Sequence, residues 1–265
     1  HPTMPELPEV HAFHQYFKQH ALNRPIQKVT VADDKIIRNL SSRSFQRRLK
    51  GRTFVDSFRR GKYLFGELDN GHHVLLHFGM TGDLIYYTQA ADKPKFERFA
   101  FVFGPQQTLA FDCTRKFARI LYLDDVEDYI RETKLGPDAL EISEERFLEL
   151  MGQRKVTIKC FLLNQHLLAG VGNLYADEVC YQCRVHPASP VAKLPPRKRR
   201  QIFAKLREIL NFAVERTVYY KDYPDNWFWE WRKEGEIGKG GNPVLRAKVA
   251  GRTTYYVDRW QKMYE

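Results

Sequence analysis

The sequence has few cysteines and no long apolar run, and both shortages narrow the class of protein. Four cysteines in 265 residues cannot form the dense disulfide framework of a small secreted domain, which favours a reducing compartment. No run of 18 apolar residues and no signal-peptide pattern occurs, so no membrane span or secretion is predicted. Cys180 and Cys183 form a lone CxxC in a helical pattern, and we interpret them as packing residues rather than zinc ligands.

Acidic residues are also in short supply. The chain has 43 Lys and Arg against 32 Asp and Glu, which gives a formal charge of +11. A globular protein this basic usually binds a polyanion, and nucleic acid is the first expectation, ahead of an anionic membrane surface. With 43% apolar residues, the chain can build more than one hydrophobic core.

The first half of the chain predicts one helix followed by a β-sandwich. Apolar residues recur at helical spacing from Val10 to Ala21. Short β-rich segments with turn signals follow, and Asp69-Asn70-Gly71 is a strong hairpin signal. Antiparallel strands at this spacing favour a sandwich. We expect strands at residues 27–32, 52–58, 62–68, 73–77, 83–87, 98–103 and 108–112, the last two as another hairpin.

The second half predicts helices and then a small hairpin, so the fold class is α+β with several domains. Residues 126–135 are interpreted as a polar bridge that ends at Leu135-Gly136-Pro137. Helical patterns start at Ser143, and a long amphipathic helix follows Pro195-Pro196. Its basic run, residues 197–200, is interpreted as a solvated face. Its inward side chains are predicted to be Ile202, Phe203, Leu206, Ile209, Leu210, Ala213 and Val214.

The last segment carries an aromatic cluster and two strand patterns. The cluster is interpreted as a small local core rather than a base-stacking surface, and strands at 244–249 and 253–257 make a hairpin. The predicted domains are a β-sandwich catalytic domain at 1–131, a helical DNA-binding domain at 132–222 and the hairpin at 223–265. The aromatic residues are Tyr223, Trp227, Phe228, Trp229 and Trp231.

The stretch from Gly170 to Asn173 joins two helical patterns. Its two glycines allow a tight turn and the close approach of another backbone. Asn173 and the N–H groups at a helix start favour an anion, which predicts a helix–turn–helix with a docking point for a phosphate. An ordinary helix pair with a glycine cap fits the spacing equally well.

Six separated motifs in one order carry a resemblance to a known family. They lie at residues 4–10, 60–64, 77–82, 135–137, 170–178 and 251–256. Through them the chain resembles the formamidopyrimidine-DNA glycosylase and endonuclease VIII family of base-excision repair enzymes along nearly its whole length. The resemblance implies a helix–two-turn–helix domain, a double-stranded DNA partner with damaged bases or abasic sites, and a monomer. It also implies a cytoplasmic, nucleoid-associated protein in a bacterium or a nuclear one in a eukaryote.

The resemblance also implies the chemistry and the residues that perform it. Pro5, as an N-terminal amine once Met4 is removed, would form a Schiff base with the sugar. This would excise an oxidised base, and β,δ-elimination at the abasic site would follow. Glu6 would transfer protons. Taken alone, these two residues favour the plainer interpretation of a helix-entry proline followed by an acid at the helix N-terminus.

The DNA contacts are likewise implied by the resemblance. Lys62, Asn173 and Arg252 match the phosphate contacts of the family, and Lys62 is also a second candidate amine for the lyase. Each of the three could otherwise be an ordinary surface or capping residue. Met80, Arg115 and Phe117 match the residues that fill the void left by an extruded base. The loop at residues 112–118 is one residue longer than the family pattern.

The chain departs from the family at its C-terminal finger and in a loop. The two cysteine pairs of the family's zinc finger are replaced by residues 238–241 and by Val257 and Trp260, so we expect a zincless finger and no metal cofactor. The segment 217–227 is shorter than the loop that caps oxidised purines. This leaves oxidised pyrimidines, ring-opened purines or abasic sites as candidate substrates.

His1-Pro2-Thr3 precede Met4, and in the chain as printed the nitrogen of Pro5 is an amide that cannot attack. The position of Met4, where the family's initiator stands, favours a cloning remnant that blocks the enzyme. If the three residues are native, two other readings remain. The protein is then a silent binder of damaged DNA or a lyase that uses another amine, such as Lys62. A basic protein associated with RNA or ribosomes is a further alternative, since similar helical elements occur there.

Overall fold

The computed structural model describes residues 4–216 and 220–265. His1-Pro2-Thr3 and the first residues of the segment 217–227, on which two expectations rest, lie outside the described residues. Residues 4–5 and 9–134 form one compact unit, and residues 6–8 and 135–265 form a second. Each unit is described by itself. No helix in the described ranges has the length and apolar character needed to span a membrane.

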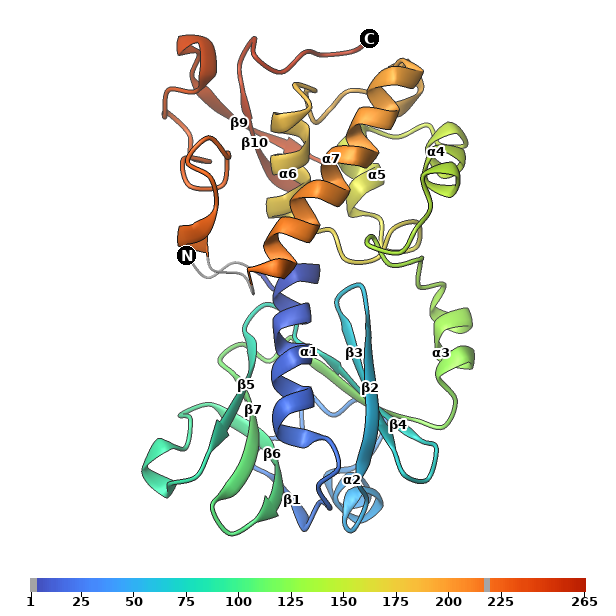
Figure 1. Cartoon of the computed structure of the whole chain (residues 1–265), viewed down its shortest axis with the longest axis vertical. Helices are drawn as coiled ribbons and strands as arrows, with labels where there is room; N and C mark the ends of the chain where they lie inside the picture. Colours follow the sequence, from blue (N-terminus) through green and yellow to red (C-terminus); the bar gives the residue numbers. More distant parts are fainter. Residues whose placement is uncertain (1–3, 217–219) are drawn as a thin grey trace. The chain divides into compact units, whose positions relative to one another are not determined.

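The first unit contains two four-stranded antiparallel sheets (Figure 1). The turn Asp69-Asn70-Gly71 joins β3 to β4, as predicted. One sheet has the order β1 (Lys28–Val31), β6 (Glu97–Gly104), β7 (Gln107–Cys113) and β5 (Gly82–Tyr87). The other has the order β2 (Phe54–Arg60), β3 (Tyr63–Leu68), β4 (His73–His77) and β8 (Arg119–Leu123).

The core of this unit lies between the two sheets. Helix α1 (Leu7–Ala21) contributes Phe17, and α2 (Ser42–Leu49), which the sequence analysis did not predict, contributes Phe45. The rings of Phe99 and Phe111 stack at 5.3 Å between centroids. The sandwich predicted from alternating apolar residues is therefore confirmed, with one unpredicted strand, β8.

The segment 126–135, predicted to be a polar bridge that ends at Leu135-Gly136-Pro137, contains helix α3 (Val126–Thr133), which the sequence analysis did not predict. The first unit ends at Lys134, directly before that tripeptide. Asp125 caps the helix by accepting a hydrogen bond from the Asp128 N–H at 3.0 Å. Tyr129 and Ile130 pack on Phe65 and its neighbours, the outward-facing apolar residues of the β2-β3-β4-β8 sheet. This contact outweighs the polar composition of the segment, because most helical stability in proteins comes from tertiary packing.

The second unit is helical and ends in the predicted hairpin. Its helices are α4 (Glu144–Gly152), α5 (Ile158–Leu163), α6 (Asn173–Gln182) and α7 (Pro196–Glu215), and its strands are β9 (Val244–Val249) and β10 (Arg252–Val257). The helix starts expected at Asn173 and Pro196 are confirmed. Short 3-10 turns are η1 (Ala90–Asp92) in the first unit and η2 (Val191–Lys193), η3 (Tyr220–Asp222) and η4 (Lys239–Gly241) in the second.

The predicted inward face of α7 and the aromatic cluster both pack inside. Five of the seven α7 side chains are buried, and Phe203 and Val214 are partly buried against the same core. Tyr223 and Trp227 join that core, whereas Phe228 joins a second one with Tyr181, Val244 and Val257. The cluster is thus core, as interpreted, but it is shared between two cores. The finer division into three domains stays a prediction.

Both cysteines of the CxxC pair lie inside the helical core, which confirms their packing role. Burial raises the pKa of the Cys180 thiol well above its usual value and that of Cys183 to about 12. Both thiols therefore stay protonated at neutral pH.

Replacement of Phe111 by Ala should lower the free energy of unfolding by about 3–5 kcal/mol, because the ring is fully buried between the sheets. Phe117→Ala is the matched control. That ring is 59% exposed, so its loss should cost no more than about 0.5 kcal/mol. Urea unfolding of both variants measures the difference, and equal losses would contradict the placement of the core.

Candidate functional site

The carboxylate of Glu6 caps the start of helix α6 in the second unit. Its Oε1 accepts hydrogen bonds from the N–H groups of Gly172 at 2.5 Å and Tyr175 at 3.4 Å. Its Oε2 accepts one from the Leu174 N–H at 2.9 Å, and only 3% of the residue is exposed. The sequence left two alternatives open for this helix start, a docking point for a phosphate or an ordinary glycine-capped helix pair. In the structure its N–H groups hold Glu6, because a helix N-terminus favours any anion of suitable reach.

Both glycines of the turn are required by this arrangement. Gly170 has φ +120°, and a Cβ there would lie 2.6–2.8 Å from side-chain atoms of Leu7. A Cβ on Gly172 would lie 2.6 Å from the Glu6 side chain. The Leu7 N–H also donates to the Gly170 carbonyl at 2.9 Å. The close backbone approach inferred from these glycines is confirmed, and the approaching segment is residues 6–8.

Asn173 lies beside the strand that begins with Arg252. Its Nδ2 donates to the Thr253 carbonyl at 2.9 Å, while its Oδ1 is buried and has no hydrogen-bond partner among the described residues. Two of the three predicted phosphate-binding residues are therefore brought together within the second unit. Their role in DNA binding stays a prediction.

Sequence reasoning missed the buried ionic residues behind this contact. Lys159 of α5 and Asp177 of α6 pair at 2.7 Å with both side chains fully buried, and Arg232 pairs with the same carboxylate at 2.7 Å. The available signal was spacing: Asp177 follows Asn173 by four residues, so both lie on one face of α6.

Glu178, next along α6, holds the aromatic segment. It is 1% exposed and accepts hydrogen bonds from the N–H groups of Phe228 and Trp229, both at 3.0 Å. Burial raises the pKa of Glu178 to about 7, although these hydrogen bonds favour the ionised form. This residue connects the helix that begins at Asn173 with the residues that follow η3.

In the first unit, Lys62 occupies the turn between β2 and β3, where Gly61 has φ +59°. The next residue, Tyr63, is paired in register with His77 at the end of β4. Burial, with Arg119 and Lys62 nearby, lowers the pKa of His77 to about 3, so the ring is neutral. Its Nδ1 accepts a hydrogen bond from the Gly79 N–H at 3.2 Å, and this fixes the turn that leads to Met80.

The three predicted void-filling residues come from two loops that lie together. A Cβ on Gly79, which has φ +60°, would lie 2.6–2.7 Å from backbone atoms of Phe117 and Ala118. The Thr81 hydroxyl accepts a hydrogen bond from the Arg115 N–H at 2.9 Å. Arg115 is exposed, Phe117 is 59% exposed and Met80 is half-buried. A large ring this exposed is available to contact a partner. Pro5 precedes α1 and belongs to the same unit.

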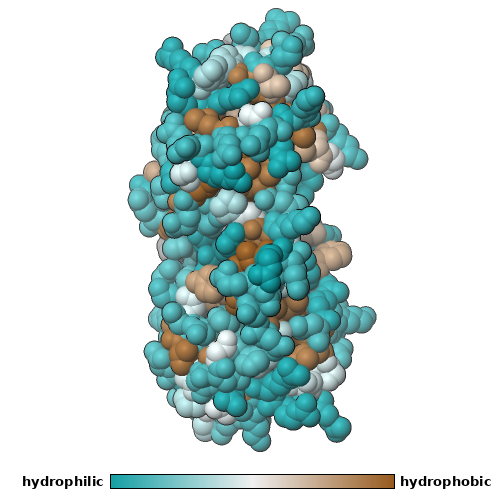
Figure 2. Space-filling view, turned by 90° about the vertical axis from the view of Figure 1, so that its right-hand side faces the viewer, coloured by the Kyte–Doolittle hydropathy of each residue, from teal (hydrophilic) through white to brown (hydrophobic). Residues whose placement is uncertain are grey.

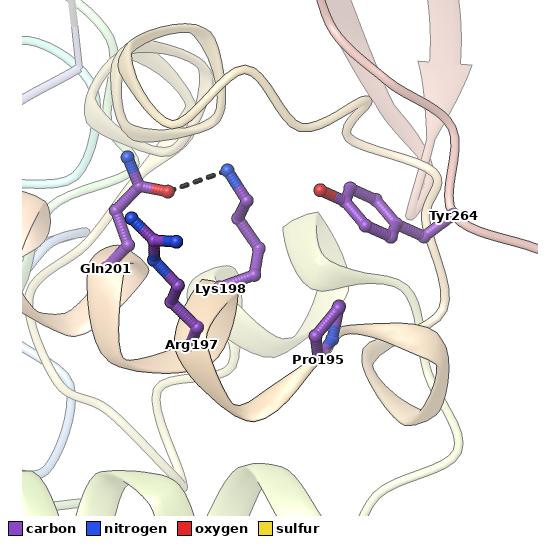
Figure 3. Close-up of a pocket in the computed structure, with 5 residues that line it drawn as sticks. All are labelled: Pro195, Arg197, Lys198, Gln201 and Tyr264. Atoms are coloured by element: carbon purple, nitrogen blue, oxygen red, sulfur yellow. Dashed lines mark hydrogen bonds between the residues drawn. The ribbon is translucent and has the colours of Figure 1, made fainter.

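The basic run at the start of α7 is only partly a solvated face. Arg197 and Arg200 are exposed, as interpreted, but Arg199 donates to the carbonyls of Leu194 and Val191 at 3.0 Å. Lys198 donates to Gln201 Oε1 at 2.6 Å, beside a pocket of about 500 Å³ (Figure 3). Figure 2 shows a largely hydrophilic face with apolar residues in small separate groups.

Candidate metal ligands are sparse in the described ranges. In residues 4–216 and 220–265, no three His, Cys, Asp or Glu side chains gather as a metal site. The hairpin instead packs through Val244 and Val257, and the guanidinium of Arg184 lies 3.8 Å from the ring centre of Trp260. The zincless finger stays a prediction.

Comparison with known proteins identifies the family. Residues 4–120 match the formamidopyrimidine-DNA glycosylase N-terminal domain, and residues 135–221 match the H2TH domain of the same glycosylase. A formamidopyrimidine-DNA glycosylase of Arabidopsis thaliana is 32% identical over 98% of this chain and 72% of its own length. One from Carboxydothermus hydrogenoformans is 31% identical over 98% of this chain and its own full length. The chain belongs to the formamidopyrimidine-DNA glycosylase family.

Solved structures agree with this assignment. The Lactococcus lactis formamidopyrimidine-DNA glycosylase, non-covalently bound to DNA with an AP site, matches with a TM-score of 0.87. The match has 26% identity and covers 97% of this chain and 99% of that one. A second structure of the L. lactis enzyme, in complex with DNA containing an oxidised pyrimidine, gives 0.86 with 26% identity, and covers 97% of this chain and all of that one. The α+β fold is thereby confirmed.

The stability of the second unit should depend on the ionisation of Glu178. Its pKa of about 7 lies above the ordinary 4.5, so the folded chain binds this proton more tightly than the unfolded chain. This contribution is fully present below pH 4.5 and is lost as the pH rises through about 7. The loss should reach about 3 kcal/mol.

Urea unfolding of Glu178→Gln between pH 4.5 and 7.5 should lack this decline, whereas the exposed control Glu208→Gln should keep it. A decline of wild-type size in Glu178→Gln would refute the assignment.

Proposed function

We propose that the protein is a base-excision repair DNA glycosylase that also cleaves the strand at abasic sites. Its substrate is double-stranded DNA, and it acts as a monomer. The observation that carries this proposal is the Pro5-Glu6 pair, in which Glu6 is locked onto α6 by three backbone N–H groups. A segment that only binds DNA has no need of a buried carboxylate fixed directly after a proline.

The reaction begins at the nitrogen of Pro5 when that residue is the N-terminus. An α-amino group titrates near pH ~8, so a neutral, nucleophilic fraction is present at physiological pH. The nitrogen attacks C1′ of the sugar, the base departs with its bonding electrons, and the nitrogen loses its proton, which gives a ring-closed aminal. The C1′–O4′ bond then breaks as O4′ takes up a proton, and this ring opening leaves the iminium. The iminium makes the C2′ proton acidic. Loss of that proton expels the 3′ phosphate, and a second elimination expels the 5′ phosphate.

Glu6 is assigned the proton transfers at the opening sugar ring. A general acid or base must lie within hydrogen-bond reach of the reacting atoms. Glu6 meets this need because it follows Pro5, the proposed nucleophile, directly in the sequence. The three N–H groups fix its carboxylate, so no rotamer search precedes the transfer.

We assign contacts with backbone phosphates to Lys62, Asn173 and Arg252. Lys62 is also the alternative nucleophile for strand cleavage at abasic sites. Phosphate contacts position the strand without reading its sequence, which suits an enzyme that must find damage anywhere. Met80, Arg115 and Phe117 are assigned to the void left by the extruded base, and the exposure of Phe117 supports this role. Oxidised pyrimidines, ring-opened purines and abasic sites are the proposed substrates, with no metal cofactor.

Borohydride trapping on an abasic-site duplex tests the nucleophile. Protein prepared to begin at Pro5 should give a covalent adduct, because its secondary amine is free to form the iminium. The chain that retains the residues before Pro5 should give none, because its Pro5 nitrogen is an amide. Adducts with both forms would assign the nucleophile to a lysine. Tight binding with no adduct from either form would make the protein a silent DNA binder.

Arg252→Ala should weaken binding to duplexes of every sequence alike, because a phosphate contact carries no sequence information. The slope of log affinity against log salt should fall by about 0.9. Fluorescence anisotropy at several salt concentrations measures both quantities. Arg259→Ala, which removes an exposed arginine from the residues after β10, serves as the control. An Arg252→Ala slope equal to that of wild type would remove Arg252 from the interface.

A further inference from the structure

The hairpin of the second unit has an open edge that a helix closes. Within residues 4–216 and 220–265, strands β9 and β10 form a sheet of two strands, so one edge of β10 has no described strand beside it. A lone two-stranded hairpin is at best marginally stable in water, and unpaired edge groups need partners. Arg252, a proposed phosphate contact, is the first residue of β10. The position of this strand therefore sets the position of that contact.

Two side chains of α6 take the place of the missing strand. Asn173 Nδ2 donates to the Thr253 carbonyl at 2.9 Å, and Asp177 Oδ2 accepts from the Tyr255 N–H at 3.1 Å. Four residues of helix advance about 6 Å, and two residues of strand advance about 6.7 Å. These two distances are similar, so residues four apart on one helix face can form hydrogen bonds with residues two apart on the strand. The amide of Asn173 donates to a strand carbonyl, and the carboxylate of Asp177 accepts from a strand N–H.

A buried ionic cluster holds the acceptor in place. The Asp177 carboxylate bonds Lys159 through Oδ1 at 2.7 Å and Arg232 through Oδ2, with Nε at 2.8 Å. Lys159 also donates to the Thr254 hydroxyl at 2.6 Å and to the Thr253 carbonyl at 3.3 Å. Asp177 and Lys159 are fully buried, so each depends on the other for compensation of its charge.

We propose that Asp177 is a positioning residue for DNA binding, which fixes β10 against α6 and thereby holds Arg252 beside Asn173. This inference rests on the proposed function. Asp177 itself is fully buried and acts only through the strand it holds.

Asp177→Asn tests the inference on a duplex that contains a tetrahydrofuran abasic analogue. The neutral amide leaves Lys159 and Arg232 without a counter-charge, so the cluster rearranges and β10 shifts. We expect roughly tenfold weaker binding, within the range for residues of one hydrogen-bond network. The salt slope should fall by about 0.9, as for loss of one phosphate contact. The concentration of binding-competent protein is set by titration with the duplex, so an unfolded fraction changes neither quantity.

The matched control is Asp258→Asn, which makes the same chemical change at a partly exposed carboxylate just after β10. It adds the same net charge and should bind at least as tightly as wild type. The decisive comparison is the double variant Asp177→Asn with Arg252→Ala. Because Asp177 acts through Arg252, the double variant should bind no more weakly than Arg252→Ala alone.

The proposal would be overturned if the losses of DNA-binding free energy from Asp177→Asn and Arg252→Ala added in full in the double variant. It would also be overturned if Asp177→Asn bound the duplex as tightly as Asp258→Asn. Arg232→Met covers the case in which Asp177→Asn does not fold. It leaves Lys159 and Asp177 as a neutral pair, but it removes the guanidinium that orients Oδ2 toward the Tyr255 N–H, so the hold on β10 is lost. A reduced salt slope in Arg232→Met supports the proposal, and wild-type binding refutes it. A wild-type protein that does not bind the duplex would refute the proposed function instead.

Discussion

The carboxylate of Glu6 at the start of α6 is the contact on which the arrangement of the second unit depends. It satisfies three backbone N–H groups that a helix start otherwise leaves without partners. It also explains both glycines of the turn, because a side chain at either position would occupy the space of Leu7 or Glu6. A short segment from the beginning of the chain thus completes a helix that starts more than 160 residues later in the sequence.

The same helix organises the hairpin. Its first turn binds Glu6, while Asn173 and Asp177 bond the edge of β10. The first two turns of this one helix therefore connect Glu6, to which the proposed chemistry is assigned, with the strand that carries the proposed DNA contact Arg252. Side chains and buried charge perform here a task for which other small hairpins use a further strand.

Local patterns predicted much of this architecture. The start of α6 followed from two glycines and an asparagine, and the hairpin followed from alternating residues around Ala250-Gly251. Helix α3 was not predicted because most of its residues are charged or polar, and its apolar face consists only of Val126, Tyr129 and Ile130. These side chains pack against the β2-β3-β4-β8 sheet, which a local sequence pattern does not report. The pairing of Lys159 with Asp177 was missed because periodicity does not report which two charges meet inside a core. The N–H groups of α6 hold the carboxylate of Glu6, which local patterns could not indicate because Glu6 lies more than 160 residues earlier in the sequence.

The burial of the cysteine thiols affects how readily the protein is oxidised. Oxidants attack thiolates far more readily than thiols, and access to the sulfur also limits the reaction. Cys113, Cys180 and Cys183 are all buried, and burial keeps the last two protonated. The burial of these thiols therefore protects them from the same oxidants that would generate the proposed substrates.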